Sequence, residues 1–177
     1  MKSTKNFTMI IACMCILTVF GGGVYEHVVL VPRWSAAPPS SLLMFNGPFG
    51  IQGEDFWIPI HPITLFFLGG ALIANWYSNR RRKILIVMGG YIVILVMTFG
   101  FFVPELITLI GTPYHDHVDP ELVRRASTWE TLSLIRLSVI AILAFILLSA
   151  LTKSHDRVKK HAHPAVPLSY ENDSMGG

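Results

Sequence analysis

Long apolar runs separated by short polar connections dominate this sequence. Four of these runs are long enough to be membrane-spanning candidates, at residues 7–31, 58–77, 84–110 and 131–151. A helix needs about 20 mostly apolar residues to cross the hydrocarbon core of a bilayer. The pattern therefore predicts an all-α integral membrane protein, in which residues 1–152 form one up-and-down four-helix bundle.

The composition agrees with this class. Only 14% of the 177 residues are charged and 52% are hydrophobic, whereas about a quarter of the residues of a soluble domain are charged. The main partner is therefore predicted to be the lipid bilayer. Little chain is left for a separate soluble domain, and the polar segment 153–177 is expected to be a disordered cytoplasmic tail.

The positive charges predict which side of the membrane each loop faces. Basic residues gather at helix ends, at Lys2, Lys5, Arg80, Arg81, Arg82, Lys83, Lys153, Arg157, Lys159 and Lys160. Because lysine and arginine concentrate in cytoplasmic loops, both termini and the turn at 79–83 are expected inside, in a bacterial inner membrane. The first outer loop, at 32–57, and the second outer loop, at 111–128, are then expected outside. This distribution accounts for the net charge of +3 without a nucleic acid partner. Binding of anionic lipid is compatible with the same charges.

The two cysteines and the first outer loop carry secondary predictions. Cys13 and Cys15 are two residues apart on a helix and point to different faces, so we expect packing or lipid-facing side chains rather than a disulfide. The prolines and glycines of the loop at 33–57 predict turns. Its Trp34 and Trp57 suit an interfacial aromatic belt, while the remaining aromatic residues are candidates for a lid over the helices.

The candidate site begins at the outer end of the first span, where Glu26 and His27 follow three glycines that suit close helix packing. An acidic or basic side chain at mid-bilayer costs roughly 2.5–3.5 kcal/mol, so such groups usually face other helices and have partners there. His61, Glu105 and Arg136 fall at the same predicted depth on the other three spans. Hydration of Glu26 and His27 by headgroups, and snorkelling of Arg136 toward them, are the alternatives.

Helical spacing adds neighbours to these residues. Trp129 lies two turns before Arg136 on the same face, and either Glu26 or Glu105 is a candidate carboxylate partner for that arginine. His61 shares a face with Thr64, Leu68 and Asn75, and the amide of Asn75 is expected to bond to a neighbouring helix rather than to a ligand. Tyr91, Thr98 and Glu105 follow each other at seven-residue intervals and are expected to lie in line.

The second outer loop has two interpretations. His115, Asp116, His117 and Asp119 are metal-ligand types, but they follow no fixed ligand spacing. The better supported interpretation makes Asp119 an N-cap, Pro120 the first helical residue and Glu121 a first-turn acid, which together begin the helix that leads into the last span. No metal site is assigned from the sequence.

Several of these features together resemble the anthrone oxygenase-like family of small four-helix membrane proteins. The resemblance rests on the glycine-containing first helix that ends in Tyr25 to Pro32, on His61-Pro62, on the basic turn, and on Trp129 with Arg136. It covers nearly all of residues 7–152. Characterised fungal members oxidise anthrones to anthraquinones without a known cofactor. The resemblance does not identify the substrate of this chain, because the family is broad.

The resemblance implies roles for the polar residues. His27 or His61 would be the general base that removes a proton from a small apolar aromatic or ketone substrate. Arg136 would stabilise the resulting enolate, and Glu26 or Glu105 would orient the histidine or the arginine. Trp129, Tyr25 and Trp57 would contact the substrate through their rings.

Three other classes remain open. His27 and His61 could ligate haem iron, or a metal pair together with Glu26 and Glu105. The polar residues could instead form a structural ion-pair lock between helices, with no reaction. A transporter is disfavoured, because four spans without an internal repeat provide a small pathway. Cofactor and oligomeric state stay undetermined, and a homo-oligomer is compatible with the sequence.

Overall fold

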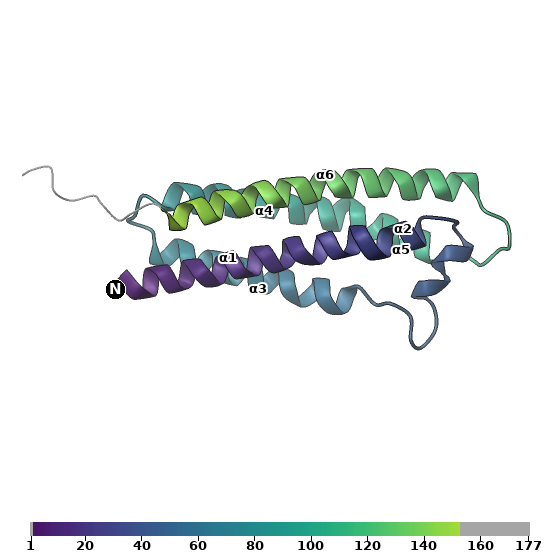
Figure 1. Ribbon diagram of the computed structural model, residues 1–177, viewed down its shortest axis with the longest axis horizontal. Coiled ribbons are helices and arrows are strands. Elements are labelled where there is room, and N and C mark those ends of the chain that lie inside the picture. Colours follow the sequence, from purple (N-terminus) through teal and green to yellow (C-terminus); the bar gives the residue numbers. More distant parts are fainter. Residues whose placement is uncertain (1, 153–177) are drawn as a thin grey trace, which may run out of the picture.

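The structure is a computed structural model that describes residues 2–152. The regular structure in this range is helical throughout, as predicted (Figure 1). Within it, four helices are long and apolar enough to cross a membrane, at Ser3–Trp34, Glu54–Ala74, Arg81–Ile110 and Pro120–Leu151. The structure therefore contains the helices that an integral membrane protein requires. The predicted tail at 153–177 lies outside the described residues.

Two of the four membrane-length helices are composite and two are continuous. The first consists of α1 (Lys2–Tyr25), η1 (Glu26–Leu30) and α2 (Val31–Trp34). The third consists of α4 (Arg81–Met97), η3 (Thr98–Phe102) and α5 (Val103–Ile110). The continuous ones are α3 (Glu54–Ala74) and α6 (Pro120–Leu151).

The starts of the continuous helices have clear local causes. Asp119 caps α6, since its side chain accepts a hydrogen bond of 2.8 Å from the backbone N–H of Glu121, as the sequence predicts. The helix α3 begins at Glu54, about a turn earlier than expected, and its first turn carries Glu54 and Asp55, which suit a helix N-terminus. Its two prolines therefore lie inside the helix rather than at its start.

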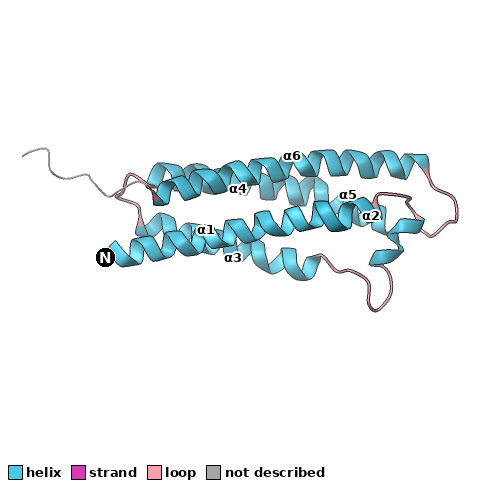
Figure 2. Ribbon diagram, in the orientation of Figure 1, coloured by secondary structure: helices cyan, strands magenta, loops and turns pink. Residues whose placement is uncertain are grey.

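The long helices lie side by side (Figure 2). α1 packs against α3 and α6, and α4 packs against α6 and α3. Their shared core is apolar, with Met9, Ile16, Leu68, Val87, Tyr91 and Leu147 fully buried. Glycines allow the close approaches expected of the first helix: a Cβ atom on Gly22 would lie 2.6 Å from the Phe56 ring, and one on Gly23 would lie 2.8 Å from Leu137.

The composite helices share a local feature, a π-helical segment followed closely by proline. η1 precedes Pro32, and η3 precedes Pro104. Proline provides no N–H group for the carbonyl one turn earlier, and its ring crowds that carbonyl. A wider turn relieves this conflict, and π-turns of this kind are frequent at functional sites.

A second apolar cluster closes the end of the molecule that the sequence predicts to face outward. This outer cluster consists of Val31, Trp34, Leu42, Phe102, Leu109, Leu122, Ala126 and Trp129. Leu42 comes from η2 (Ser40–Phe45), a 3-10 helix in a loop that was expected to contain turns alone. Trp34 is 2% exposed, so its assignment to an interfacial belt is wrong. Part of the first outer loop instead folds back over the helices, with Phe45 packed against this cluster, whereas Phe56 lies in α3 and Phe49 is 98% exposed.

The opposite end is tied together by polar side chains. Arg80 donates to the carbonyl of Leu151, and Lys83 Nζ donates to the carbonyl and hydroxyl of Ser149. These cations thus lie at the carboxyl end of α6, where they are favourable for the helix dipole. Asn75 donates to the Ala71 carbonyl and, at 3.4 Å, to the Lys5 carbonyl of α1. Its predicted role between helices is confirmed.

The cysteines also behave as predicted. Cys13 and Cys15 are both free, and Cys13 is buried in the core shared by the long helices. Cys15 is partly exposed. Neither cysteine therefore contributes a covalent constraint to the fold.

Candidate functional site

Glu26 and His27 are the first residues of η1, the π-helical segment of the first long helix. Nδ1 of His27 lies 2.8 Å from the Gly23 carbonyl oxygen. A carbonyl oxygen can only accept, so Nδ1 carries the proton and donates it. Nε2 is then the lone-pair nitrogen, and it is buried without a hydrogen-bond partner among the described residues. His27 therefore has an available basic atom inside the protein.

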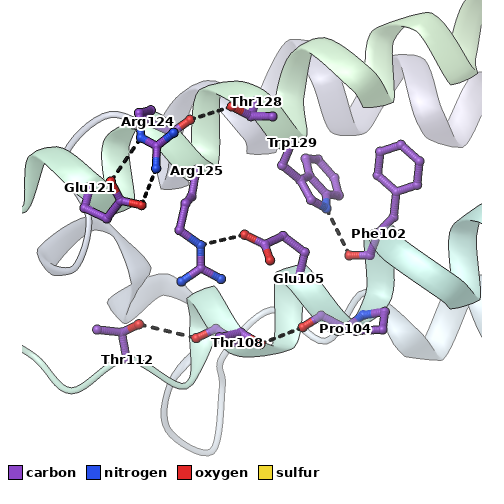
Figure 3. A network of polar contacts seen from close by, with 10 residues as sticks. All are labelled: Phe102, Pro104, Glu105, Thr108, Thr112, Glu121, Arg124, Arg125, Thr128 and Trp129. Atoms are coloured by element: carbon purple, nitrogen blue, oxygen red, sulfur yellow. Dashed lines mark hydrogen bonds and ion pairs between the residues drawn. The ribbon is translucent and has the colours of Figure 1, made fainter.

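The Trp129 ring of α6 packs against the His27 ring of η1. The two rings are stacked at 14° with centroids 6.4 Å apart. The Trp129 indole donates a 3.0 Å hydrogen bond to the Phe102 carbonyl, which is visible in Figure 3. Phe102 ends η3, so a residue of one π-segment anchors the tryptophan that stacks on a residue of the other.

Arg136 lies beside the aromatic group of His27, Trp129 and Phe102 and is partly buried. Its guanidinium donates to Thr98 Oγ1 at 3.2 Å and to Ser133 Oγ at 2.8 Å. The guanidinium carbon also sits 4.2 Å from the centre of the Phe102 ring, a cation–π distance. Arg136 thus makes its contacts with other side chains inside the protein.

Glu26 is the carboxyl group of this region. It interacts electrostatically with Arg136 and with His27, and its side chain is within hydrogen-bonding reach of Trp57. No direct Glu26–Arg136 contact is present among the ion pairs of the described residues. Glu26 and Arg136 therefore interact electrostatically at a distance and do not form a salt bridge.

His61 enters from α3. Its Nδ1 lies 2.8 Å from the Tyr91 hydroxyl of α4, and its ring stacks on Trp57 at 5.5 Å and 21°. Arg136 also interacts electrostatically with His61. His61 is 8% exposed and shares its buried face with Thr64, Leu68 and Asn75, which the helical spacing predicted.

These contacts join residues of all four long helices into one region. We call it the polar cluster and define it as Glu26, His27, His61 and Arg136, with Trp57, Tyr91, Thr98, Trp129 and Ser133 as their direct or electrostatic neighbours. The outer cluster adjoins it, because Trp129 and Phe102 belong to both. The polar cluster therefore lies beneath the apolar closure of the outer end.

Glu105 does not join the polar cluster. Its carboxylate accepts a 2.7 Å bond from Arg125, seen in Figure 3, and both side chains are partly exposed. The sequence placed Glu105 in line with Tyr91 and Thr98 by assuming a regular α-helix. The π-segment at Thr98–Phe102 puts an extra residue into the turn and rotates the helix beyond it, Glu105 included.

Tyr25 lies on the surface, whereas Trp57 lies beside the polar cluster. Tyr25 is 58% exposed on the surface of the first long helix, so it takes no part in the contacts of the polar cluster. Trp57 is partly buried and lies between Glu26 and His61. Of the three aromatic residues predicted to contact a substrate, Trp57 and Trp129 lie beside the histidines.

Sequence reasoning missed the direct partners of the charged groups. Ser133 lies three residues before Arg136, a helical spacing that identifies it as a candidate partner. Thr98 and Tyr91 were recognised as sharing a face, but their partners Arg136 and His61 were not. Pairings between helices have no signal in a single sequence.

The second outer loop does not gather its metal-ligand residue types. Tyr114 donates a 2.5 Å hydrogen bond to Asp116, which raises the pKa of the phenol. In residues 2–152, no group of three His, Cys, Asp or Glu side chains is placed to hold a metal ion. The metal pair considered from the sequence is therefore not assembled, and Glu105 lies apart with Arg125.

The polar cluster combines three chemical capacities: a lone-pair imidazole nitrogen, a guanidinium charge and flat aromatic surfaces. An imidazole can exchange protons near neutral pH, and a buried cation stabilises a developing anion.

Comparison of the chain with protein-family models, with curated proteins and with solved structures finds no match.

Proposed function

We propose that this chain is a membrane enzyme that removes a proton from a small, apolar aromatic ketone or related carbon acid and oxygenates the product without a cofactor. The observation that carries the proposal is the state of His27. Its Nδ1–H group is engaged by the Gly23 carbonyl, and its buried Nε2 has no hydrogen-bond partner among the described residues. This is the arrangement that a general base requires.

The neighbouring groups fit the same reaction. Nε2 of His27 accepts the proton, and Arg136 stabilises the enolate by its charge. The enolate carbon then reacts with O₂, and the resulting peroxide takes up a proton and loses water to leave a ketone. Two hydrogens thus leave the substrate carbon, and one oxygen atom of O₂ enters while the other departs in water. Trp57 and Trp129 offer ring faces to a flat substrate.

The proposal includes an orientation in the membrane. The four long helices form an up-and-down bundle with both termini in the cytoplasm of a bacterial cell, and the polar cluster lies in the outer leaflet. The basic residues at 80–83 and their contacts with the end of α6 support this orientation, since basic residues mark the cytoplasmic side.

The test is oxygen uptake by the purified protein in liposomes with an anthrone as substrate. We expect turnover by the natural protein and a loss of about 100-fold or more in His27→Gln, the range that general bases contribute. The matched control is His115→Gln in the exposed outer loop, which should retain the full rate. Equal rates in His27→Gln and the natural protein would remove His27 as the base, and no uptake by the natural protein would remove this substrate class.

An absorption spectrum and a metal analysis of the same sample address the redox alternative. A Soret band or stoichiometric metal that disappears in the double variant His27→Ala/His61→Ala would replace the oxygenase proposal with a haem or metal protein. We expect neither signal in the natural protein.

A structural role is the second candidate, and the internal partners of Arg136 favour it. Thr98, Ser133 and the Phe102 ring together hold the guanidinium without any ligand. In that case His27→Gln and Arg136→Gln would lower the stability of the folded protein, while no substrate would be consumed by any variant.

A further inference from the structure

The structure holds a chain of hydrogen bonds behind His61 that the proposed base does not use. It runs from His61 on α3 to the Tyr91 hydroxyl of α4, which lies within hydrogen-bonding reach of Thr64 on α3. His61, Tyr91 and Thr64 are 8%, 0% and 0% exposed. Because each hydroxyl group has a single hydrogen, the direction of every bond in this chain can be worked out.

The direction starts from the helix backbone. The Thr64 hydroxyl donates to the Ile60 carbonyl at 2.8 Å, which uses its only hydrogen. Its oxygen can then only accept, so in a hydrogen bond with the Tyr91 hydroxyl, which lies within reach, Tyr91 is the donor. That bond in turn uses the only hydrogen of Tyr91.

These two bonds favour one tautomer of His61. With its hydrogen on Thr64, the Tyr91 oxygen must accept in the 2.8 Å contact with His61 Nδ1, so Nδ1 carries the proton. Nε2 of His61 is then the lone-pair atom. His27 reaches the same tautomer by a separate route, through the Gly23 carbonyl. The cluster therefore contains two imidazoles whose Nε2 atoms are acceptors.

We propose that Tyr91 is a positioning residue that holds His61 in the Nδ1–H tautomer, so that His61 Nε2 accepts a hydrogen bond from a hydroxyl group on the substrate. This inference rests on the proposed function and narrows its substrate class to hydroxylated aromatic ketones. His27 takes the proton of the reacting carbon, while His61 recognises the substrate hydroxyl. Stacking on Trp57 keeps the His61 ring in the orientation that this contact needs.

The direct test is the protonation site of His61, measured by ¹⁵N NMR on histidine-labelled protein in liposomes. The His61 signal is assigned by its absence in His61→Gln. We expect the proton on Nδ1 in the natural protein. In Thr64→Val the Tyr91 hydroxyl loses its acceptor and turns its hydrogen to Nδ1, so the His61 proton should move to Nε2. A natural protein with the proton on Nε2 would overturn the inference.

A matched control and a second variant separate this effect from general damage. Thr18→Val removes the same type of bond, from Thr18 Oγ1 to the Met14 carbonyl, at an exposed site on α1, and should leave the His61 signal unchanged. Tyr91→Phe removes the hydroxyl and should abolish the strong preference for Nδ1–H. An unchanged preference in both Tyr91→Phe and Thr64→Val would also overturn the inference.

Binding of two probes distinguishes this inference from the proposed function. The probes are a hydroxylated anthrone and the same anthrone without hydroxyl groups. We expect the natural protein to favour the hydroxylated probe by about tenfold, the worth of one well-formed hydrogen bond. Thr64→Val should reduce that preference, because a phenol oxygen accepts from Nε2–H less well than a phenol O–H donates to Nε2. Equal binding of both probes would overturn the role of His61. The expected NMR result with no binding of either probe would contradict the proposed function but uphold the positioning of His61 by Tyr91.

Discussion

At the scale of single residues, the polar cluster is defined by which atoms have partners. Arg136 has two hydroxyl groups and a ring face, and Trp129 has a backbone carbonyl, so both are held by the protein itself. His27 differs, because only one of its two ring nitrogens is satisfied among the described residues. Residues of the first kind set geometry, and the unsatisfied nitrogen is where chemistry is expected.

The hydrogen bond from Trp129 to Phe102 predicts a measurable loss of stability. Trp129→Phe keeps an aromatic ring but leaves the buried carbonyl without this donor. We expect the free energy of unfolding to fall by about 1–3 kcal/mol, the cost of an unsatisfied buried group. Thermal unfolding in detergent measures the change. Trp76→Phe at the 40% exposed inner position is the control and should stay within about 0.5 kcal/mol of the natural protein.

Glu105 and Glu26 should differ sharply when each is neutralised. The Glu105–Arg125 pair is partly exposed, and such pairs contribute about 1 kcal/mol or less, so Glu105→Gln should fold and turn over substrate within about threefold of the natural rate. Glu26→Gln removes the carboxylate that acts on both Arg136 and His27, and should lower the rate by about tenfold or more. Rates in the opposite order would show that Glu105 belongs to the site.

At the scale of helices, the π-segments decide what the sequence could and could not predict. The long apolar runs, the Asp119 cap and the buried face of His61, Thr64 and Leu68 were all predictable from hydropathy, local capping and regular helical spacing. The position of Glu105 was not, because η3 interrupts that spacing. Pro32 and Pro104 are the available signals for such interruptions, yet Pro59 and Pro62 lie within an α-helix, so proline alone is not sufficient.

The packing of α4 on α6 predicts opposite responses at two adjacent glycines. A Cβ atom on Gly90 would lie 2.9 Å from Leu143, which is buried, whereas one on Gly89 would meet nothing within 4 Å. Both alanine substitutions gain the same helix propensity, so their difference isolates the packing. We expect Gly90→Ala to be less stable than Gly89→Ala by about 1–3 kcal/mol. Equal unfolding midpoints would contradict this packing of α4 on α6.

At the scale of the whole molecule, α6 is longer than a bilayer core requires. Its 32 residues extend about 48 Å at 1.5 Å per residue, against a hydrocarbon thickness of about 30 Å. Its first turns, with Arg124 and Arg125, therefore project beyond the core in the proposed orientation. The outer cluster includes Leu122 and Ala126 from these turns, so in that orientation part of it would lie in the headgroup region or above it.

The proposed orientation is testable by labelling single cysteines from outside intact cells. In a background with Cys13→Ala and Cys15→Ala, His117→Cys in the exposed second outer loop should react with a membrane-impermeant maleimide. Arg82→Cys, also exposed, should react only after the cells are permeabilised. The reverse pattern would invert the topology and move the polar cluster to the inner leaflet.

The outer cluster has a further consequence for how a substrate is delivered. Trp34 and Trp129 are each 2% exposed and pack edge to face at 5.4 Å, so their rings obstruct the direct path from that end of the molecule to His27. We expect an apolar substrate to arrive laterally from the acyl chains. The concentration of substrate dissolved in the lipid, set by its partition coefficient, then determines how far the enzyme is saturated. Added lipid dilutes the substrate within the membrane. At fixed protein, adding empty liposomes should raise the apparent KM per litre in proportion to the lipid, while KM per mole of lipid stays constant.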